Sequence, residues 1–338
     1  MSTKKINFGL IGAGRIGSFH GETVARRLKD AELVAIADPA PGAAAKLADS
    51  LDVANAYDDV ATLLAHPGVD AVIITTPARF HTNVLVQAAE AGKAIFCEKP
   101  MALTLDDADR AIAAVKKAGV PLQVGFNRRW DPSFAEGRAA IDAGKIGTPQ
   151  LIRSLTRDPG PFSADPARIP LWTIFYETLI HDFDTLLWLN PGAKPVEVYA
   201  IGEALVRPDA KGDGFLDTAV VTIRFDNGSV AVAEANFSAL YGYDIRGEVF
   251  GSAGMVAMGD VRRSSMTLYD ANGVSNDTWR RDTDHFIHGY TAQLGSFVRS
   301  VRAGKLIEGP TGSDARNALA IALAAIRSVE AKGPVAVA

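Results

Sequence analysis

The stretch Ile6-Asn-Phe-Gly-Leu-Ile11, followed at once by Gly12-Ala-Gly14-Arg-Ile-Gly17, decides the fold class of this chain. An apolar strand that enters a glycine turn and then a helix can hold a pyrophosphate. Gly12 allows the tight turn, Gly14 lets backbone N–H groups reach the phosphates, and Gly17 lets the helix pack closely on the sheet. Because 31 of the 338 residues are glycine, this pattern can arise by chance, so its position between a strand and a helix over 15–29 is the decisive observation.

A single acidic residue completes the dinucleotide signature. Asp38 closes the next apolar run, Leu33-Val-Ala-Ile-Ala-Asp38, and lies 21 residues after Gly17. A carboxylate at this spacing can accept hydrogen bonds from the adenosine ribose and would repel a 2′-phosphate, which favours NAD over NADP. The alternative interpretation is a turn residue before Pro39.

Short apolar runs alternate with helical patterns through the first 125 or so residues, which is typical of a doubly wound parallel sheet. We expect an NAD-binding Rossmann domain over residues 1–125. The expected strands are 6–11, 33–37, 71–76, 94–97 and 122–125, and the expected helices are 15–29, 41–51, 60–65, 80–91 and 105–118.

The pattern changes after residue 125. Helices near 132–143 and 175–189 precede strand-like segments at 196–206, 215–226, 229–238, 243–251 and 255–258, and Asp226-Asn-Gly228-Ser is a strong hairpin signal. We therefore expect residues 126–338 to form an α+β domain for substrate binding and oligomerisation. It would be built on a large, mainly antiparallel open sheet, with helices at 285–303 and 314–331 packing back on the first domain.

The composition argues against several classes of protein. A hydrophobic content of 48% describes a globular chain, and a net charge of −4 gives no basic footprint for nucleic acid. No apolar run is long enough to cross a bilayer, so we expect no membrane partner. The single cysteine, Cys97, and an N-terminus without a cleavable apolar signal predict a cytoplasmic protein. No cluster has metal-ligand spacing, so no metal is expected.

Two segments at strand ends carry candidate groups, since ligands of this fold bind outside the carboxyl ends of the strands. Thr75-Thr76-Pro77 could face the pyrophosphate or the nicotinamide ribose, or form a capped turn. In Glu98-Lys99-Pro100, the lysine can donate to a substrate oxygen, although a lone lysine is more often a solvated surface residue.

A third segment, Glu177-Thr-Leu-Ile-His181-Asp-Phe-Asp184, falls in an expected helix. Glu177 and His181 are four residues apart and therefore share a face. A carboxylate beside an imidazole can orient the ring as a general base for a hydroxyl proton. By itself, the pair would more often be a surface Glu–His contact.

Together with Gly125-Phe-Asn-Arg-Arg-Trp130 and Tyr241-Gly-Tyr-Asp-Ile-Arg-Gly-Glu248, these motifs resemble the glucose–fructose oxidoreductase and inositol dehydrogenase (Gfo/Idh/MocA) family. The resemblance runs nearly end to end and is greatest to bacterial inositol 2-dehydrogenases. It implies NAD-dependent oxidation of a ring hydroxyl of a cyclic polyol, with hydride passing to nicotinamide C4. It also implies a homotetramer built through the sheet of the second domain.

The resemblance also implies roles for individual residues. Lys99 would position the reacting hydroxyl, His181 would take its proton, and Glu177 would support the histidine. Tyr241 or Tyr243 would close the polyol pocket. The expected substrate contacts are Lys99, Asn127, Asp158, Glu177, His181 and Tyr241, with Arg157 beside them. The expected cofactor contacts are Gly12, Gly14, Arg15, Ile16, Gly17, Asp38, Thr75, Thr76, Pro77, His81, Glu98 and Lys99.

The chain departs from the family pattern in two places. Glu177 stands where the family usually carries aspartate, and Trp172 and Thr173 replace two glycines common in relatives. A bulky tryptophan could reshape the pocket, so a pyranose or ketosugar oxidoreductase using NAD or NADP is an alternative function. A dinucleotide-bound sensor without turnover is a second alternative, although it would need neither Lys99 nor His181.

Overall fold

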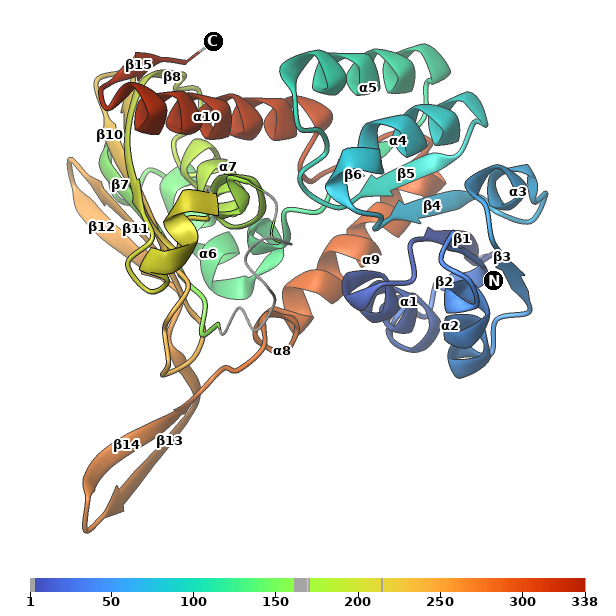
Figure 1. The fold of residues 1–338 in the computed structure, drawn as a ribbon, viewed down its shortest axis with the longest axis horizontal. Helices are drawn as coiled ribbons and strands as arrows, with labels where there is room; N and C mark the ends of the chain where they lie inside the picture. The colour runs from blue at the N-terminus through green and yellow to red at the C-terminus, as the bar shows by residue number, and fades with distance from the viewer. Residues whose placement is uncertain (1–3, 161–168, 170, 214, 338) are drawn as a thin grey trace. The chain divides into compact units, whose positions relative to one another are not determined.

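The N-terminal part of the chain forms a six-stranded parallel sheet. A computed structural model describes residues 4–160, 169, 171–213 and 215–337 of the chain. The strand order is β3-β2-β1-β4-β5-β6, which confirms the doubly wound topology and places the switch point between β1 and β4. The strands are β1 (Ile6–Ile11), β2 (Ala31–Ala37), β3 (Asn55–Tyr57), β4 (Ala71–Ile74), β5 (Ala94–Cys97) and β6 (Leu122–Val124) (Figure 1).

The helices of this half begin and end at local sequence signals. Asp59 and Thr104 accept backbone N–H groups at the starts of α3 and α5, and Gly119, with a φ of 67°, ends α5 in the left-handed conformation that glycine adopts readily. The helices are α1 (Arg15–Arg27), α2 (Ala43–Leu51), α3 (Val60–Ala65), α4 (His81–Glu90) and α5 (Leu105–Ala118).

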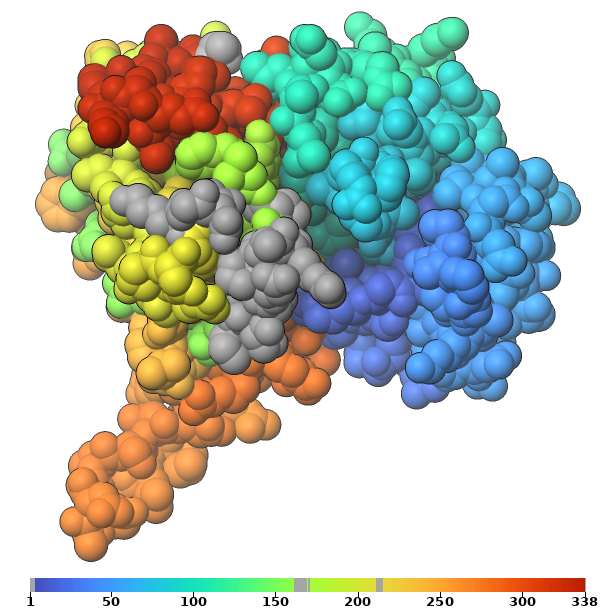
Figure 2. All heavy atoms as spheres, in the orientation of Figure 1, coloured from blue at the N-terminus to red at the C-terminus, as the bar shows by residue number. Residues whose placement is uncertain are grey.

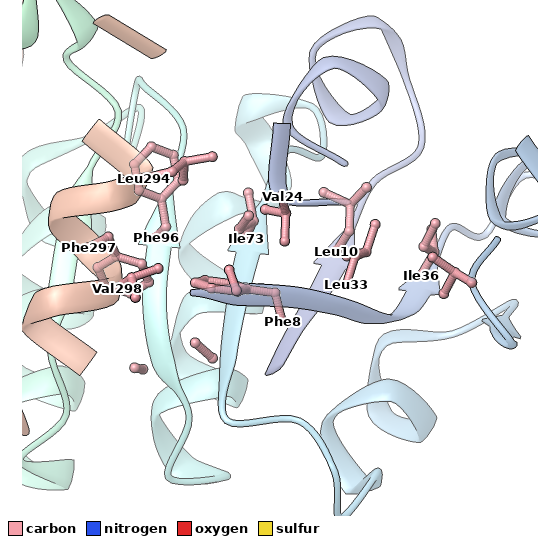
Figure 3. Packing of buried hydrophobic residues seen from close by; sticks show 14 of the residues in the cluster. Phe8, Leu10, Val24, Leu33, Ile36, Ile73, Phe96, Leu294, Phe297 and Val298 are labelled. Carbon is pink, nitrogen blue, oxygen red and sulfur yellow. The ribbon is translucent and has the colours of Figure 1, made fainter. Parts of the chain in front are cut away.

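A helix from late in the sequence completes the core of this half. Leu294, Phe297 and Val298 of α9 (Ile287–Ala303) belong to the same buried cluster as Phe8 and Phe96 (Figure 3). Contacts divide the chain into unit 1, residues 1–130 and 288–316, and unit 2, residues 131–287 and 317–338. The core of unit 1 therefore depends on residues far apart in the sequence.

Unit 2 is built on a seven-stranded sheet of order β12-β11-β7-β10-β9-β8-β15. Only the β7–β10 pair is parallel among these described strands, which confirms a mainly antiparallel open sheet. The expected hairpin joins β9 to β10, with Gly228 at a φ of 84°. The strands are β7 (Pro149–Arg157), β8 (Pro195–Glu203), β9 (Thr218–Phe225), β10 (Val230–Asn236), β11 (Asp244–Gly251), β12 (Gly254–Met258) and β15 (Val335–Ala336).

One face of this sheet is covered and the other is open. Helix α7 (Ile180–Trp188) packs on β7 and β10. A π-helical turn, Ile174–Leu179, precedes α7 where the sequence pattern predicted one continuous helix. The remaining helices with residues in unit 2 are α6 (Pro132–Asp142), α8 (Asp282–His285) and α10 (Gly312–Ala331), whose first residues belong to unit 1.

A hairpin that the sequence pattern did not predict follows the large sheet. Strands β13 (Arg262–Asp270) and β14 (Gly273–Thr278) pair only with each other in the described structure, and nearly all their residues are exposed. Figures 1 and 2 show this orange hairpin extending away from the seven-stranded sheet. Because neither face is buried, apolar alternation in its strands is limited to Met266 and Leu268, which are both exposed.

The described helices include none that is both long enough and apolar enough to cross a membrane.

Candidate active site

The glycine turn of unit 1 gives each of its three glycines a separate role. Gly12 has a φ of +105°, and a side chain there would come within 2.8 Å of the Thr75 backbone. A Cβ on Gly17 would lie 2.0 Å from the Gly12 carbonyl oxygen, so helix α1 can approach only because this residue is glycine. At Gly14, by contrast, no atom of the described residues lies within 4 Å of the Cβ position.

The open space at Gly14 lies at the N-terminus of a helix. Gly14 is the N-cap of the 13-residue helix α1, and no side chain of the described structure caps it. The first N–H groups of a helix carry a partial positive charge and bind phosphate well. The residues of this turn therefore fit the pyrophosphate of a dinucleotide.

Asp38 lies against the same turn. Its carboxylate accepts the backbone N–H of Ala13 at 2.7 Å and that of Ala40 at 2.8 Å. The bond from Ala40 is typical of the turn that the alternative interpretation predicts. The bond from Ala13 holds the carboxylate beside the glycine turn. The two interpretations are therefore compatible.

The two threonines at the end of β4 differ in their partners. The Thr75 hydroxyl donates to the Gly12 carbonyl oxygen at 2.8 Å, so it holds the glycine turn against β4. The Thr76 hydroxyl is buried, and no described group hydrogen-bonds to it. Of the two threonine hydroxyls, that of Thr76 is therefore the one available to hydrogen-bond to a ligand. Pro77, the next residue, is exposed.

His81 joins two of the predicted cofactor segments to each other. Its ring nitrogens lie 2.6 Å from the Thr76 carbonyl oxygen and 2.8 Å from the Pro100 carbonyl oxygen, and the side chain is buried. Both contacts are with backbone oxygens. His81 therefore links the loops after β4 and β5 through hydrogen bonds. Its contact with the cofactor stays a prediction.

Lys99 follows β5 on a firmly held backbone. Its N–H lies 3.2 Å from a carboxylate oxygen of Glu98, whose other oxygen lies 2.7 Å from Nε2 of His20. Burial by itself raises the pKa of Glu98, but the hydrogen bond and charge of His20, together with Lys99, outweigh it and hold the pKa below its ordinary value. Glu98 is therefore a buried, ionised carboxylate directly behind Lys99.

Asn127 lies at the same edge of the sheet. It begins a 3₁₀ turn after β6, and the Gly125 N–H donates to the Cys97 carbonyl oxygen at 2.8 Å, which keeps the two strand ends side by side. Asn127 is buried. Unit 1 thus gathers the glycine turn, Asp38, Thr76, Lys99 and Asn127 at the carboxyl ends of its parallel strands.

In unit 2, the strand β7 holds the helix that carries His181. Asp182 is fully buried, and its carboxylate accepts the hydroxyls of Ser154 at 2.5 Å and Thr156 at 2.7 Å. His181 is the residue before Asp182 and the second residue of α7, and the Thr185 hydroxyl donates to its carbonyl oxygen at 2.7 Å. These bonds fix the helical turn from which the His181 side chain projects.

Asp158, the residue after β7, lies on the side of the sheet that α7 covers. Alternate residues of a strand share a face, so Asp158 is on the same side as Ser154 and Thr156. Its carboxylate accepts the Gly160 N–H and the Tyr243 hydroxyl, each at 2.8 Å. The structure therefore brings Asp158 together with Tyr243.

Tyr241 belongs to the opposite face of the sheet. Its hydroxyl donates to Asp244 at 2.8 Å, and Arg157 pairs with Glu234 at 2.8 Å beside it. With Thr218, Val220 and Asn236, these residues line a pocket of about 360 Å³ on the open face. The substrate role predicted for Tyr241 stays a prediction, and the position of Tyr243 beside Asp158 favours the other tyrosine.

The local backbone around Glu177 departs from a regular helix. Glu177 lies in the π-helical turn, and such turns are frequent at functional sites. Just before it, Trp172 has a φ of +62°, a left-handed conformation that favours glycine, and its ring packs 6.1 Å from that of Phe175. A glycine at this position would adopt this backbone without strain.

The sequence pattern did not single out His20. His20, Gly21 and Val24 follow Gly17 by three, four and seven residues and share the buried face of α1 with it. A histidine on a buried helix face needs a polar partner, and this spacing was the available signal.

The parallel sheet, its glycine turn and the carboxylate after β2 define a dinucleotide-binding oxidoreductase. Comparison with known proteins specifies the class. Residues 6–126 match the model of the oxidoreductase family with an NAD-binding Rossmann fold, and residues 134–257 match the GFO/IDH/MocA C-terminal domain. The chain belongs to the GFO/IDH/MocA oxidoreductase family, and its first half is an NAD-binding Rossmann domain.

Its relatives include several inositol dehydrogenases. The chain is 38% identical to the myo-inositol 2-dehydrogenase of Thermotoga maritima, over 97% of each chain. It is 36% identical to the inositol 2-dehydrogenase of Rhizobium meliloti, over 98% of this chain and 99% of that one. A crystal structure of scyllo-inositol dehydrogenase from Lactobacillus casei with bound NAD(H) and scyllo-inositol superposes with a TM-score of 0.94 at 27% identity, covering 99% of each chain.

Proposed function

We propose that this protein oxidises a ring hydroxyl of a cyclic polyol, myo- or scyllo-inositol, to the corresponding inosose with NAD as the acceptor. The observation that carries the proposal is the arrangement in unit 1, where Lys99 follows a strand end of the same sheet edge as the glycine turn and Asp38. The inositol dehydrogenases among its relatives support the choice of substrate.

In the proposed mechanism, two side chains handle the hydroxyl proton. Lys99 donates a hydrogen bond to the reacting oxygen, and the His181 imidazole accepts the proton as general base while Glu177 orients it. Asn127, Asp158 and Tyr243 hold the remaining hydroxyls of the ring, since amide, carboxylate and phenol groups all bond to hydroxyls. When bound, NAD supplies the acceptor at nicotinamide C4 for the hydride that leaves the carbinol carbon.

The test is the appearance of NADH at 340 nm when the full chain is mixed with NAD and each inositol stereoisomer. We expect turnover with myo- or scyllo-inositol and a lower kcat/KM with NADP. Lys99→Ala and His181→Ala should each lose about 10²- to 10⁴-fold in kcat while still binding NAD. Lys117→Ala is the matched control, because Lys117 is exposed on α5. No absorbance change with any inositol would refute the proposal.

One observation favours a second substrate class. Trp172 keeps a left-handed backbone where relatives commonly carry glycine, so a bulky ring stands shortly before the Glu177 turn. A pyranose or ketosugar is the corresponding alternative substrate. A panel of sugars, tested with NAD and NADP in both directions, separates the two, and activity confined to inositols removes this alternative. A protein that binds NAD but turns over no substrate of either panel would instead be a sensor.

We also propose that the chain assembles into a homotetramer through the open face of the seven-stranded sheet. Exposed apolar side chains gather on this face, and such patches mark interaction surfaces. They are Leu151, Tyr199, Ile201, Val220, Val230, Phe250 and Met255. Ile201 of β8 and Val220 of β9 are direct cross-strand neighbours on this face. Light scattering should give the tetramer mass for the wild type and a lower mass for Ile201→Lys with Val220→Lys, whereas a wild-type monomer would contradict the proposal.

A further inference from the structure

Unit 1 buries a hydrogen-bonded histidine–glutamate pair directly behind the proposed substrate-binding lysine. His20, on α1, is completely buried, and its Nε2 lies 2.7 Å from Oε1 of Glu98, which is 6% exposed. The ring of His20 is packed edge-on against three aromatic rings, those of Phe19, Phe96 and Tyr290, at centroid distances of 5.5–6.1 Å. The histidine is therefore held in one orientation, with Nε2 toward the carboxylate.

The Glu98 carboxylate is confined on its other sides as well. Its Oε2 accepts the Lys99 N–H at 3.2 Å. A Cβ on Gly125 would lie 2.8 Å from Oε1, so the backbone after β6 lies directly against the carboxylate. One carboxylate thus connects helix α1, the turn that carries Lys99 and the loop that leads to Asn127.

Burying a carboxylate so completely requires a partner that favours its charge. Glu98 has this partner in His20, and the pKa of Glu98 lies below its ordinary value even though burial alone would raise it. Among the described neighbours of the pair, Lys99 adds a positive charge that also lowers the pKa of Glu98. Burial and the nearby Glu98 carboxylate raise the pKa of the Cys97 thiol, which adds no charge, and the phenol ring of Tyr290 packs against His20.

We propose that His20 is a positioning residue for the reaction: through Glu98, it holds the backbone turn that carries Lys99 without touching the substrate. This inference rests on the proposed function, in which Lys99 meets the reacting hydroxyl. The same carboxylate is bonded to His20 at 2.7 Å and to the Lys99 N–H at 3.2 Å, so the position of the turn depends on both contacts. Removing the His20 donor should raise the pKa of Glu98, weaken its bond to the Lys99 N–H and let the turn shift.

The first test is the pH profile of kcat/KM for three proteins. His20→Phe keeps an aromatic ring among Phe96 and Tyr290 but removes the donor, and we expect kcat/KM to fall about 10- to 100-fold through misplacement of Lys99. We expect the acid limb of the kcat/KM profile of His20→Phe to move to higher pH by about one unit or more, because a buried carboxyl without a partner takes up a proton more readily. His20→Gln returns an N–H donor and should recover much of the activity and of the wild-type limb.

The matched control is His66→Gln. His66 is also in unit 1 and half-buried, but its ring accepts the Gly68 N–H far along the chain from Lys99. This variant should keep the wild-type profile. A His20→Phe protein that loses activity with an unmoved acid limb would show a purely structural role and overturn the inference.

The second test does not depend on turnover. Lysine labelled with ¹³C at Cε gives one NMR signal for each lysine side chain in the NAD-bound full chain, and the Lys99 signal is assigned by its loss in Lys99→Arg. In His20→Phe the Lys99 signal should move from its wild-type position, and in His20→Gln it should return toward that position, because the turn that carries Lys99 is displaced and then held again. A Lys99 signal that does not move in His20→Phe overturns the inference, whether or not an inositol is oxidised. A wild type inactive on every inositol refutes the proposed function instead and leaves this spectrum to decide the role of His20.

Discussion

Two glycines of the same turn should respond in opposite ways to one added methyl group. A Cβ on Gly17 would lie 2.0 Å from the Gly12 carbonyl oxygen and 2.8 Å from the Thr75 hydroxyl, whereas a Cβ on Gly14 meets no described atom within 4 Å. Gly17→Ala must therefore separate α1 from β1 in the free protein. Gly14→Ala should leave the free protein folded and fill space that we assign to the pyrophosphate.

The expected magnitudes differ accordingly. Overpacking typically costs about 1–3 kcal/mol, and for a unit of this size each kcal/mol lowers Tm by about 2–4 °C, so Gly17→Ala should melt several degrees early. Gly14 has a φ of −73°, which alanine also adopts, and exchanging an N-cap glycine for alanine costs at most about 1 kcal/mol. NAD at 100 times its Kd stabilises the wild type by about 2.7 kcal/mol, and Gly14→Ala should lose this gain.

The assay is thermal unfolding with and without NAD. Gly92→Ala is the control, because Gly92 also has open space at its Cβ position but lies after α4, outside the predicted cofactor contacts. With a φ of +70°, it should lose stability without losing the NAD-induced shift. If Gly14→Ala shows the full wild-type shift with NAD, the space above Gly14 does not hold the pyrophosphate and the reasoning is refuted.

Three further outcomes follow from other contacts. Asp38→Ser should lower the ratio of kcat/KM for NAD over NADP by about tenfold or more by removing a carboxylate that repels a 2′-phosphate; an unchanged ratio in paired assays would assign Asp38 to the turn alone. Trp172→Gly should be about 1 kcal/mol more stable to urea than Trp172→Ala, because glycine accepts the φ of +62°, and equal stabilities would contradict the strain. Burial alone raises the pKa of Asp314, but the charge of Arg129 and the Thr311 hydrogen bonds hold it below its usual value. Stability from a lowered carboxyl pKa is present above the unfolded pKa of about 3.9 and disappears as the pH falls through the folded pKa. Urea midpoints of wild type and Asp314→Asn should therefore differ at pH 7 and converge below about pH 4, and a difference that persists in acid would contradict this account.

The sequence predicts best what is decided locally. Gly12 and Gly17 are recognisable because a turn and a close helix approach are set within a dozen residues, and the strand-and-helix alternation of unit 1 follows from buried apolar runs. The role of His20 could not be predicted in this way because its partner, Glu98, is 78 residues away in the sequence. Pairing between distant segments depends on the topology of the sheet, which no local pattern encodes.

Two elements of unit 2 show a different limit. The hairpin of β13 and β14 has neither face buried, so its strands carry too short an apolar alternation, Met266 and Leu268, to predict a strand. The π-helical turn before α7 contains one more residue per hydrogen-bonded ring than an α-helix, and spacing alone does not distinguish the two. The likeness of sequence motifs identified Glu177 and His181 as candidates, whereas the backbone irregularity between them was visible only in the structure.

Strand β7 ends at Arg157, and this residue and the next one, Asp158, face different surfaces. Arg157 faces the open side of the sheet with Glu234, while Asp158 faces α7 with Tyr243. Because successive side chains of a strand point in opposite directions, an exchange at one of these positions leaves the environment of the other in place. We therefore expect substitutions of Asp158 to alter the proposed substrate contact and substitutions of Arg157 to alter the proposed assembly face, each without affecting the other.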